Sequence, residues 1–122
     1  MRNGKGKNYC DGILIYEGEY LNGERNGRGK EYEINGKLIF EGEYLNGKRN
    51  GKGKKYYYGK LLFEGEFFNG EIWTGKGKEY HYSDVLKYEG EYLNGKWNGK
   101  GRKYDENGNL IFEGDYLNGY KI

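Results

Sequence analysis

The sequence predicts an all-β protein: an elongated, twisted, single antiparallel meander sheet of tandem β-hairpin repeats, with about ten strands. Three observations support this fold class. A motif of the form aromatic-Glu-Gly-acid-aromatic recurs at intervals of 24, 23, 25 and 24 residues. Within the motif, aromatic residues and glycine alternate with the period of a β-strand. The 122 residues include 24 glycines and no proline, and only 34% are hydrophobic, too few for a thick globular core.

The first strand of each unit carries this motif. Its copies begin at Tyr16, Phe40, Phe63, Tyr88 and Phe112. In the first copy, "YEGEY", the residues Tyr16, Gly18 and Tyr20 share one strand face, and Glu17 and Glu19 lie on the opposite face. A helix is disfavoured because the glycines are dense and no apolar stripe of helical period is present.

The second strand of each unit contains a Gly-x-Gly pair. The pairs are Gly4/Gly6, Gly27/Gly29, Gly51/Gly53, Gly75/Gly77 and Gly99/Gly101. Three residues after each pair stands a tyrosine: Tyr9, Tyr32, Tyr56, Tyr80 and Tyr104. Since this tyrosine is out of phase with the glycines, we expect a β-bulge to return it to the aromatic face.

Short turns connect successive units. The connecting dipeptides are Asp11-Gly12, Asn35-Gly36, Tyr58-Gly59, Ser83-Asp84 and Asn107-Gly108. Most of them accept the positive φ that two-residue hairpin turns require, so we expect tight turns at these places. One hairpin is marginal in water, and each copy here covers the aromatic face and the open edge of the next. Glycine on the aromatic face would let a neighbouring ring lie flat over the backbone.

The segments "YEGEYLNGERNGRG", "FEGEYLNGKRNGKG" and "YEGEYLNGKWNGKG" resemble MORN repeats, and "GKKYYYGKLLFEGEF" is similar to the variant MORN repeats of bacterial proteins. The resemblance covers essentially the whole chain. We therefore expect residues 1–122 to form a single MORN-like array of about five units, with half-units at both ends. The resemblance implies a ladder of hairpins that acts as a scaffold for protein assembly, sometimes linked to membranes, without catalytic or ligand-binding residues common to the family.

Charge and cysteine content exclude several classes of function. The formal net charge is +2, and each basic row has an acidic row in the same hairpin, so we expect no nucleic-acid binding. The single cysteine, Cys10, offers no internal disulfide. With no apolar run of signal-peptide or membrane-spanning type, the sequence predicts a cytoplasmic protein, with membrane or cytoskeletal association as further expectations.

No catalytic, metal or cofactor site is expected. Acid pairs such as Glu17/Glu19 and Glu64/Glu66 recur in every unit beside equally repeated basic residues, which indicates a charge ladder and not two catalytic carboxylates. His81 is the only histidine, has no ligand partners near it in sequence, and is expected to be a strand residue.

The irregular positions are the candidate partner-binding residues. Two units have an arginine in the "NGxRNG" loop, where the third unit has Ile72-Trp73 and the fourth has Trp97; Phe68 replaces a leucine. Since equivalent loops line one edge of a meander, we expect Phe68, Ile72, Trp73 and Trp97 to cluster on the C-terminal half of that edge. The alternative is that each indole folds back over its own hairpin and stacks on a tyrosine.

The sequence thus predicts a non-enzymatic scaffold for protein–protein interaction or assembly, with a protein partner. The alternative is a peripheral module that binds anionic lipid through its lysine rows, with a tryptophan in the headgroup layer. The chain opens on the second half of a unit and closes on the first half of another, so we also expect self-association through the terminal strands.

Overall fold

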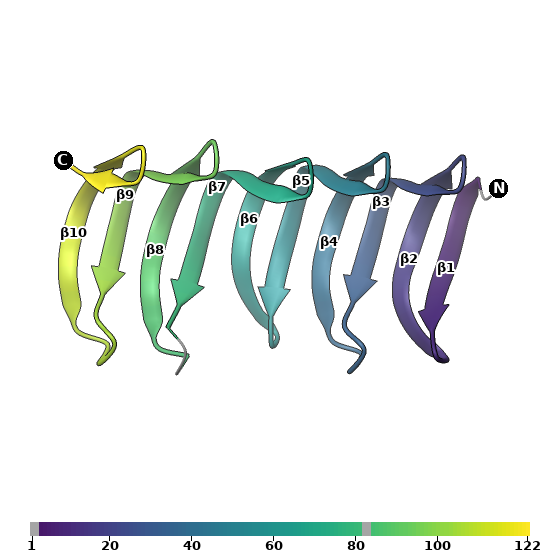
Figure 1. The fold of residues 1–122 in the computed structure, drawn as a ribbon, viewed down its shortest axis with the longest axis horizontal. Coiled ribbons are helices and arrows are strands. Elements are labelled where there is room, and N and C mark those ends of the chain that lie inside the picture. Colours follow the sequence, from purple (N-terminus) through teal and green to yellow (C-terminus); the bar gives the residue numbers. More distant parts are fainter. Residues whose placement is uncertain (1–2, 82–83) are drawn as a thin grey trace.

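The computed structural model describes residues 3–81 and 84–122. In these residues, eleven strands follow one another in sequence order in a single antiparallel sheet, and the hairpins are stacked along the long axis (Figure 1). The strands are β1 (Gly4–Cys10), β2 (Ile13–Leu21), β3 (Glu24–Tyr32), β4 (Leu38–Leu45), β5 (Lys48–Tyr57), β6 (Lys60–Phe68), β7 (Glu71–Tyr80), β8 (Leu86–Leu93), β9 (Lys96–Tyr104), β10 (Leu110–Leu117) and β11 (Tyr120–Lys121). The predicted fold class is confirmed, and β11 is a two-residue addition to the expected strands.

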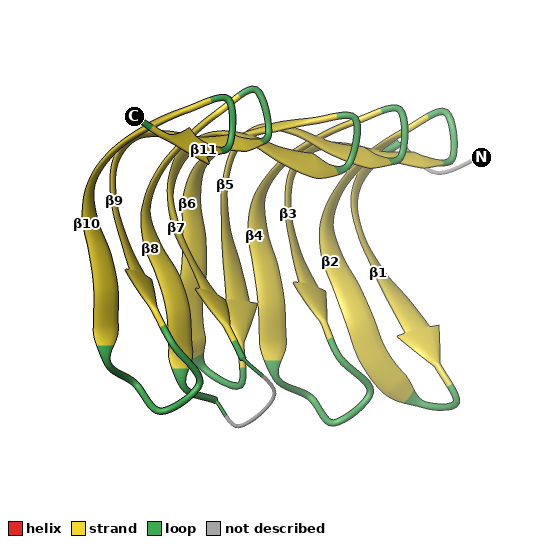
Figure 2. Cartoon of the chain, turned by 60° about the vertical axis from the view of Figure 1, so that its left-hand side comes forward, coloured by secondary structure: helices red, strands yellow, loops and turns green. Residues whose placement is uncertain are grey.

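Each long strand bends sharply. The ring centroids of Tyr16 and Tyr20 lie 5.4 Å apart, although four extended residues span about 13 Å. The strand must therefore curve toward its aromatic side, and Figure 2 shows the strands turning from one arm into a second. We call the aromatic, concave side the inner face and the side that carries Glu17 and Glu19 the outer face. The sequence predicts a twisted sheet, but it does not predict this bend within each strand.

The core is a row of aromatic rings on the inner face. Its buried members are Tyr16, Tyr20, Phe40, Tyr44, Phe63, Phe67, Tyr88, Tyr92 and Tyr116. They meet edge to face both within a strand and between hairpins: Tyr16 contacts Tyr44 at 5.3 Å, and Phe40 contacts Phe67 at 5.0 Å between centroids. Edge-to-face contacts of this kind add to the stabilisation from burial alone. Each hairpin therefore completes the core of the next.

Glycines line the sheet beneath these rings. A Cβ atom at Gly29 would lie 2.6 Å from Cε1 of Tyr16, and one at Gly53 would lie 2.6 Å from Cζ of Phe40. The predicted role of the glycines on the aromatic face is confirmed. From β1 to β7 they pair with one another across every strand boundary, as in Gly29 with Gly42 and Gly42 with Gly53.

Two-residue turns close the hairpins at one end of the sheet. Each is an Asn-Gly pair with positive φ at both residues, as at Asn22 (52°) and Gly23 (81°). Asp11-Gly12 and Tyr58-Gly59 form the same kind of turn at the opposite end, as predicted. The values of φ match the mirror-image turns that suit the right-handed twist of paired strands.

The predicted tight turns at Asn35-Gly36 and Asn107-Gly108 are wrong. Both dipeptides lie in longer connections, residues 33–37 and 105–109. In the second, the Asp105 carboxylate accepts hydrogen bonds from the backbone N–H groups of Asn107 and Asn109, so a side-chain-capped loop replaces the tight turn. In the predicted Ser83-Asp84 turn, Ser83 lies outside the described residues.

The expected return of the out-of-phase tyrosines to the aromatic face is also wrong. The register does shift beside Tyr32, but the extra residue, Ile39, belongs to β4, so the phase of β3 is unchanged. The Tyr32 hydroxyl consequently lies on the outer face and donates to Glu17 Oε1 at 2.7 Å. Burial, followed by this hydrogen bond, raises the pKa of Tyr32 to about 12. Tyr56 and Tyr104 make the same hydrogen bond to the outer-face residues Glu41 and Glu89.

The outer face carries the predicted charge ladder. Acidic and basic side chains alternate from strand to strand, as in Glu41, Lys54 and Glu64. Lys54 Nζ lies 3.8 Å from Glu64 Oε2, and both side chains are about half exposed. An ion pair this exposed stabilises the folded state by at most about 1 kcal/mol. β1 and β11 lie at opposite ends of the sheet, and association through the terminal strands stays a prediction.

Candidate protein-interaction surface

The third hairpin, β6–β7, breaks the regular register of the sheet. In the first two hairpins, one glycine of β3 or β5 pairs with a glycine on both sides. In β7, Gly75 pairs with Gly65 of β6, whereas Gly77 pairs with Gly90 of β8. The glycine row therefore steps by two residues within β7, and the rows of charge on the outer face step with it.

Trp73 is the extra residue in this hairpin. Phe67 pairs with Ile72 and Glu66 pairs with Thr74, which leaves Trp73 opposite no residue. A hydrogen-bond series along the hairpin ends supports this alignment, because the Asn46 backbone N–H donates to the Asn26 side chain, whereas Asn94 donates to Thr74 Oγ1 at 3.4 Å. Thr74 thus takes the place of the usual asparagine, and the segment between the turn and this position is one residue longer than in the other hairpins. Toward β8, the Trp73 carbonyl accepts from the Gly95 N–H as the Arg25 carbonyl accepts from the Gly47 N–H, so Trp73 is the extra residue only in the pairing with β6.

Phe68 and Trp73 meet on the outer face at the turn end of this hairpin. Their ring centroids lie 5.1 Å apart with an angle of 43° between the planes. The side chain of Phe68 is 55% exposed and that of Trp73 is 38% exposed. We call this pair, together with the adjacent Glu66 and Glu71, the aromatic corner.

Ile72 and Trp97 lie on the inner face instead. Trp97 stacks on Tyr88 at 4.2 Å with an interplanar angle of 4°, and its Nε1–H donates to Glu79 Oε2 at 2.7 Å. Ile72 packs against the core. For Trp97 this is the alternative that the sequence left open, an indole that folds back over its own hairpin.

Of the four predicted partner-binding residues, the structure therefore brings together Phe68 and Trp73. Ile72 and Trp97 occupy a cover position over the deepest rings, which arginines fill elsewhere: Arg25 lies 4.3 Å from the Tyr16 centroid. Because β7 has one extra residue before Thr74, Trp73 lies on the face opposite to Ile72 and Trp97. The spacing in the sequence alone did not show this difference in face.

Replacing Trp97 with alanine should lower the free energy of unfolding by about 2–3 kcal/mol, because a half-buried stacked ring is lost. Trp97→Arg should retain most of that stability, because an arginine there would repeat the arrangement of Arg49, which lies over Phe40 at 4.6 Å, and would face Glu79. Urea denaturation followed by circular dichroism measures both variants. An arginine variant as unstable as the alanine variant would contradict the cover position.

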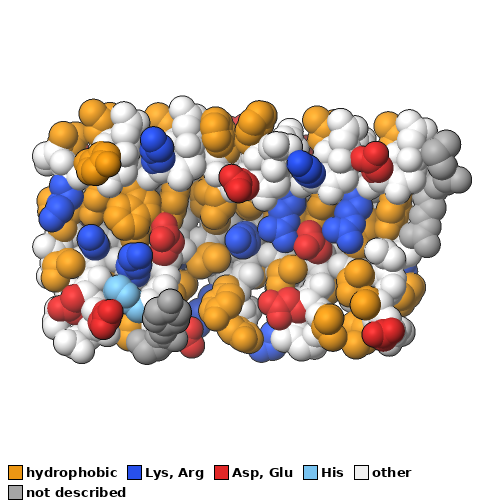
Figure 3. All heavy atoms as spheres, in the orientation of Figure 1, with side chains coloured by type: hydrophobic (Ala, Val, Ile, Leu, Met, Phe, Trp, Pro, Cys, Tyr) orange, Lys and Arg blue, Asp and Glu red, His pale blue; other side chains and the backbone are white. Residues whose placement is uncertain are grey.

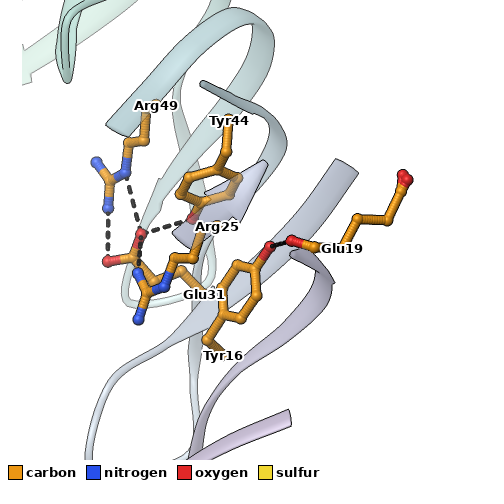
Figure 4. A network of polar contacts seen from close by, with 6 residues as sticks. All are labelled: Tyr16, Glu19, Arg25, Glu31, Tyr44 and Arg49. Carbon is orange, nitrogen blue, oxygen red and sulfur yellow. Dashed lines mark hydrogen bonds and ion pairs between the residues drawn. The ribbon is translucent and has the colours of Figure 1, made fainter. Parts of the chain in front are cut away.

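A polar network on the inner face was not predicted from the sequence (Figure 4). Glu31 accepts hydrogen bonds from the Tyr44 hydroxyl at 2.7 Å and from Arg49 Nη2 at 3.0 Å, and Arg25 Nη1 lies 3.7 Å from it. Burial alone would raise the pKa of Glu31, but these hydrogen bonds and the two guanidinium charges outweigh it and lower the pKa. The signal was present, because Glu31 stands two residues after Gly29 and so shares its face.

Figure 3 views this inner face, where basic and acidic side chains interrupt a band of hydrophobic groups along the molecule. The deep rings are therefore covered by the chain's own side chains. The aromatic corner differs, because its two rings cover each other only in part.

The described residues contain no group of three or more His, Cys, Asp or Glu side chains placed to hold a metal ion. His81 directly follows β7 and is not a strand residue as predicted; its Nε2 lies 3.1 Å from the Tyr104 carbonyl oxygen. Nor does the described part of the chain contain a helix long and apolar enough to cross a bilayer.

The MORN repeat family model matches residues 16–37, 40–60 and 88–110, which together are more than half of the chain. The chain belongs to the MORN repeat family. Repeats of this family act as scaffolds and not as catalysts. They occur in proteins that take part in protein–protein interaction or associate with membranes. No curated protein matches the chain. Most of the irregular third hairpin of this MORN array, including the aromatic corner, lies between the matched stretches.

Proposed function

We propose that this MORN array is a non-enzymatic scaffold that binds a protein partner, with the aromatic corner as the main contact. The observation that carries the proposal is the exposed contact of Phe68 with Trp73 at the third hairpin, whose register departs from that of the first two. Both rings keep surface in water that a partner would bury on binding. Exposed aromatic groups of this kind are enriched among the residues that dominate binding energy at protein interfaces.

The position of the corner fits a contact of this type. At the same place in the neighbouring hairpins stand single leucines, Leu45 and Leu93, each about half exposed. The corner is therefore the widest apolar feature in a row that continues on both sides of it. A partner that contacts the corner can gain further burial from either leucine, which supports binding along the edge and not end-on.

A lipid surface is the alternative occupant. The exposed leucines favour it, but the charge rows of the outer face do not. Lys54, for example, stands between Glu41 and Glu64. Anionic membranes attract segments with an excess of basic residues. The balanced rows therefore support a protein partner over a membrane.

The double change Phe68→Leu with Trp73→Ser tests the proposal. The immobilised array is exposed to a lysate of its source cells, retained proteins are quantified by mass spectrometry, and each candidate is then measured in purified form. We expect at least one protein to bind directly and to lose about thirtyfold in affinity with the double variant, as for a strong interface residue.

Leu21→Ser is the matched control, since Leu21 holds the position of Phe68 in the first hairpin. This variant should bind as the unaltered array does, and circular dichroism should be the same for all three. Equal retention of every protein by the double variant would refute the site. Salt-sensitive sedimentation with anionic liposomes, lost in the double variant, would favour the lipid alternative.

A further inference from the structure

We propose that the aromatic corner recognises a cationic side chain, an arginine or lysine, of the partner protein. This inference rests on the proposed function and names the chemistry of the partner. Three features of the described residues carry it: the geometry of the two rings, the placement of two carboxylates beside them, and the distribution of the chain's own basic groups.

The two rings are arranged to contact a third group. Most ring pairs of the core meet edge to face at angles of 79° to 89°, which suits the closed row of rings. Phe68 and Trp73 instead lean at 43°, and both remain partly exposed, so ring surface is left for a third group to contact. A cation over the face of a tryptophan or phenylalanine ring is attracted by its quadrupole.

The chain's own cations cover other rings of the array. Lys37 Nζ lies 5.2 Å from the Tyr58 centroid, and Lys60 Nζ lies 5.5 Å from that of Tyr80. Among the residues that the structure describes, no lysine or arginine lies over Phe68 or Trp73. The corner is thus an aromatic site whose cation would come from another molecule.

Two exposed carboxylates flank the rings. Glu71 stands directly opposite Phe68 in the register, and Glu66 lies two residues before Phe68 on the same face and opposite Thr74. In the described part of the chain neither carboxylate forms an ion pair. Both carboxylates therefore remain available to pair with a cation held against the rings.

The register step changes the neighbours of Glu66. In the second hairpin Glu43 pairs with Arg28 on one side, and its carboxylate accepts a hydrogen bond from the backbone N–H of Lys52 on the other. Glu66 has Lys52 on one side, but Thr74 on the other. The same irregularity that lengthens β7 thus places an uncharged threonine beside Glu66 on one side, next to the two rings.

Capped five-residue peptides of sequence Gly-Ser-Arg-Ser-Gly, with citrulline or glutamate in place of arginine in two further peptides, are the probes. The indole N–H signals of ¹⁵N-labelled array report binding by NMR. Trp97 serves as the internal control, because its indole lies on the inner face in contact with Tyr88. The Trp73→Ser variant assigns the two signals.

We expect the arginine peptide to shift the Trp73 signal and to leave the Trp97 signal in place. The citrulline peptide, which has nearly the same shape without the charge, should bind about fivefold more weakly, and the glutamate peptide more weakly still. Glu66→Gln with Glu71→Gln should weaken arginine binding to a similar extent. Glu24→Gln, at the position of Glu71 in the first hairpin, should not change it.

The inference would be overturned if the arginine and citrulline peptides had the same titration midpoint. It would also be overturned if the Trp73 indole signal did not move at the highest soluble peptide concentration. In that case a partner that still depends on Phe68 and Trp73 would leave the proposed function standing, with apolar burial as its basis. If the arginine peptide binds but no protein partner depends on the corner, the proposed function fails instead.

Discussion

Replacing Gly42 with alanine should lower the free energy of unfolding by about 3 kcal/mol and the thermal midpoint by about 10 °C. A Cβ atom at this position would lie 2.5 Å from the Cα of Gly53 and 2.5 Å from the carbonyl oxygen of Lys52. Both are backbone atoms of the paired strand, so no side chain can move aside and the two strands must separate. The loss should therefore exceed that of an ordinary surface substitution.

Gly59→Asn is the control for this substitution. Gly59 has positive φ at a turn with no atom near a new Cβ, and asparagine accepts that conformation. The thermal midpoint of the Gly59→Asn variant, measured by circular dichroism, should remain within a few degrees of that of the unaltered protein. A Gly42→Ala variant as stable as the control would contradict the close packing of the glycine row.

The repeated core explains why a chain with so few aliphatic residues folds. The rings of one hairpin lie over the glycines of the same hairpin and against the rings of the next, as Tyr16 lies over Gly29 and contacts Tyr44. Stability in such arrays depends on contacts between neighbouring units. A substitution at one glycine of this row therefore weakens the packing of its hairpin against both neighbouring hairpins.

Strand order and the identity of the core could be predicted because both follow from local alternation. Tyr16, Gly18 and Tyr20 share a face in any extended strand. The sharp bend could not be predicted, because it depends on how closely two rings of one strand approach. The side of Tyr32 was missed for a related reason: a bulge was expected on its own strand and formed on the paired one.

The candidate site could be predicted only in part. Departures from the repeat identified Phe68 and Trp73, which the structure places in contact. The spacing could not separate them from Ile72, because an inserted residue changes which face its neighbours occupy, and the strand register is needed to show that Ile72 pairs with Phe67. Glu66 was interpreted as an ordinary ladder acid, since the threonine opposite it is a property of the register.

Restoring the regular repeat in the third hairpin tests most directly whether the aromatic corner is the binding site. The segment "FNGEIWTGKG", residues 68–77, is replaced by "LNGKRNGKG", residues 45–53 of the same chain, which removes the insertion and both exposed rings. We expect an array with unchanged circular dichroism and equal or higher stability, because the replacement repeats a hairpin that already packs in this sheet.

The decisive measurement is the affinity of this regularised array for the purified partner, by isothermal titration calorimetry beside the unaltered array. We expect a loss of about thirtyfold or more, because the rings that dominate the contact are gone while the scaffold remains. A folded regularised array that binds the partner with undiminished affinity would contradict the assignment of partner binding to the aromatic corner.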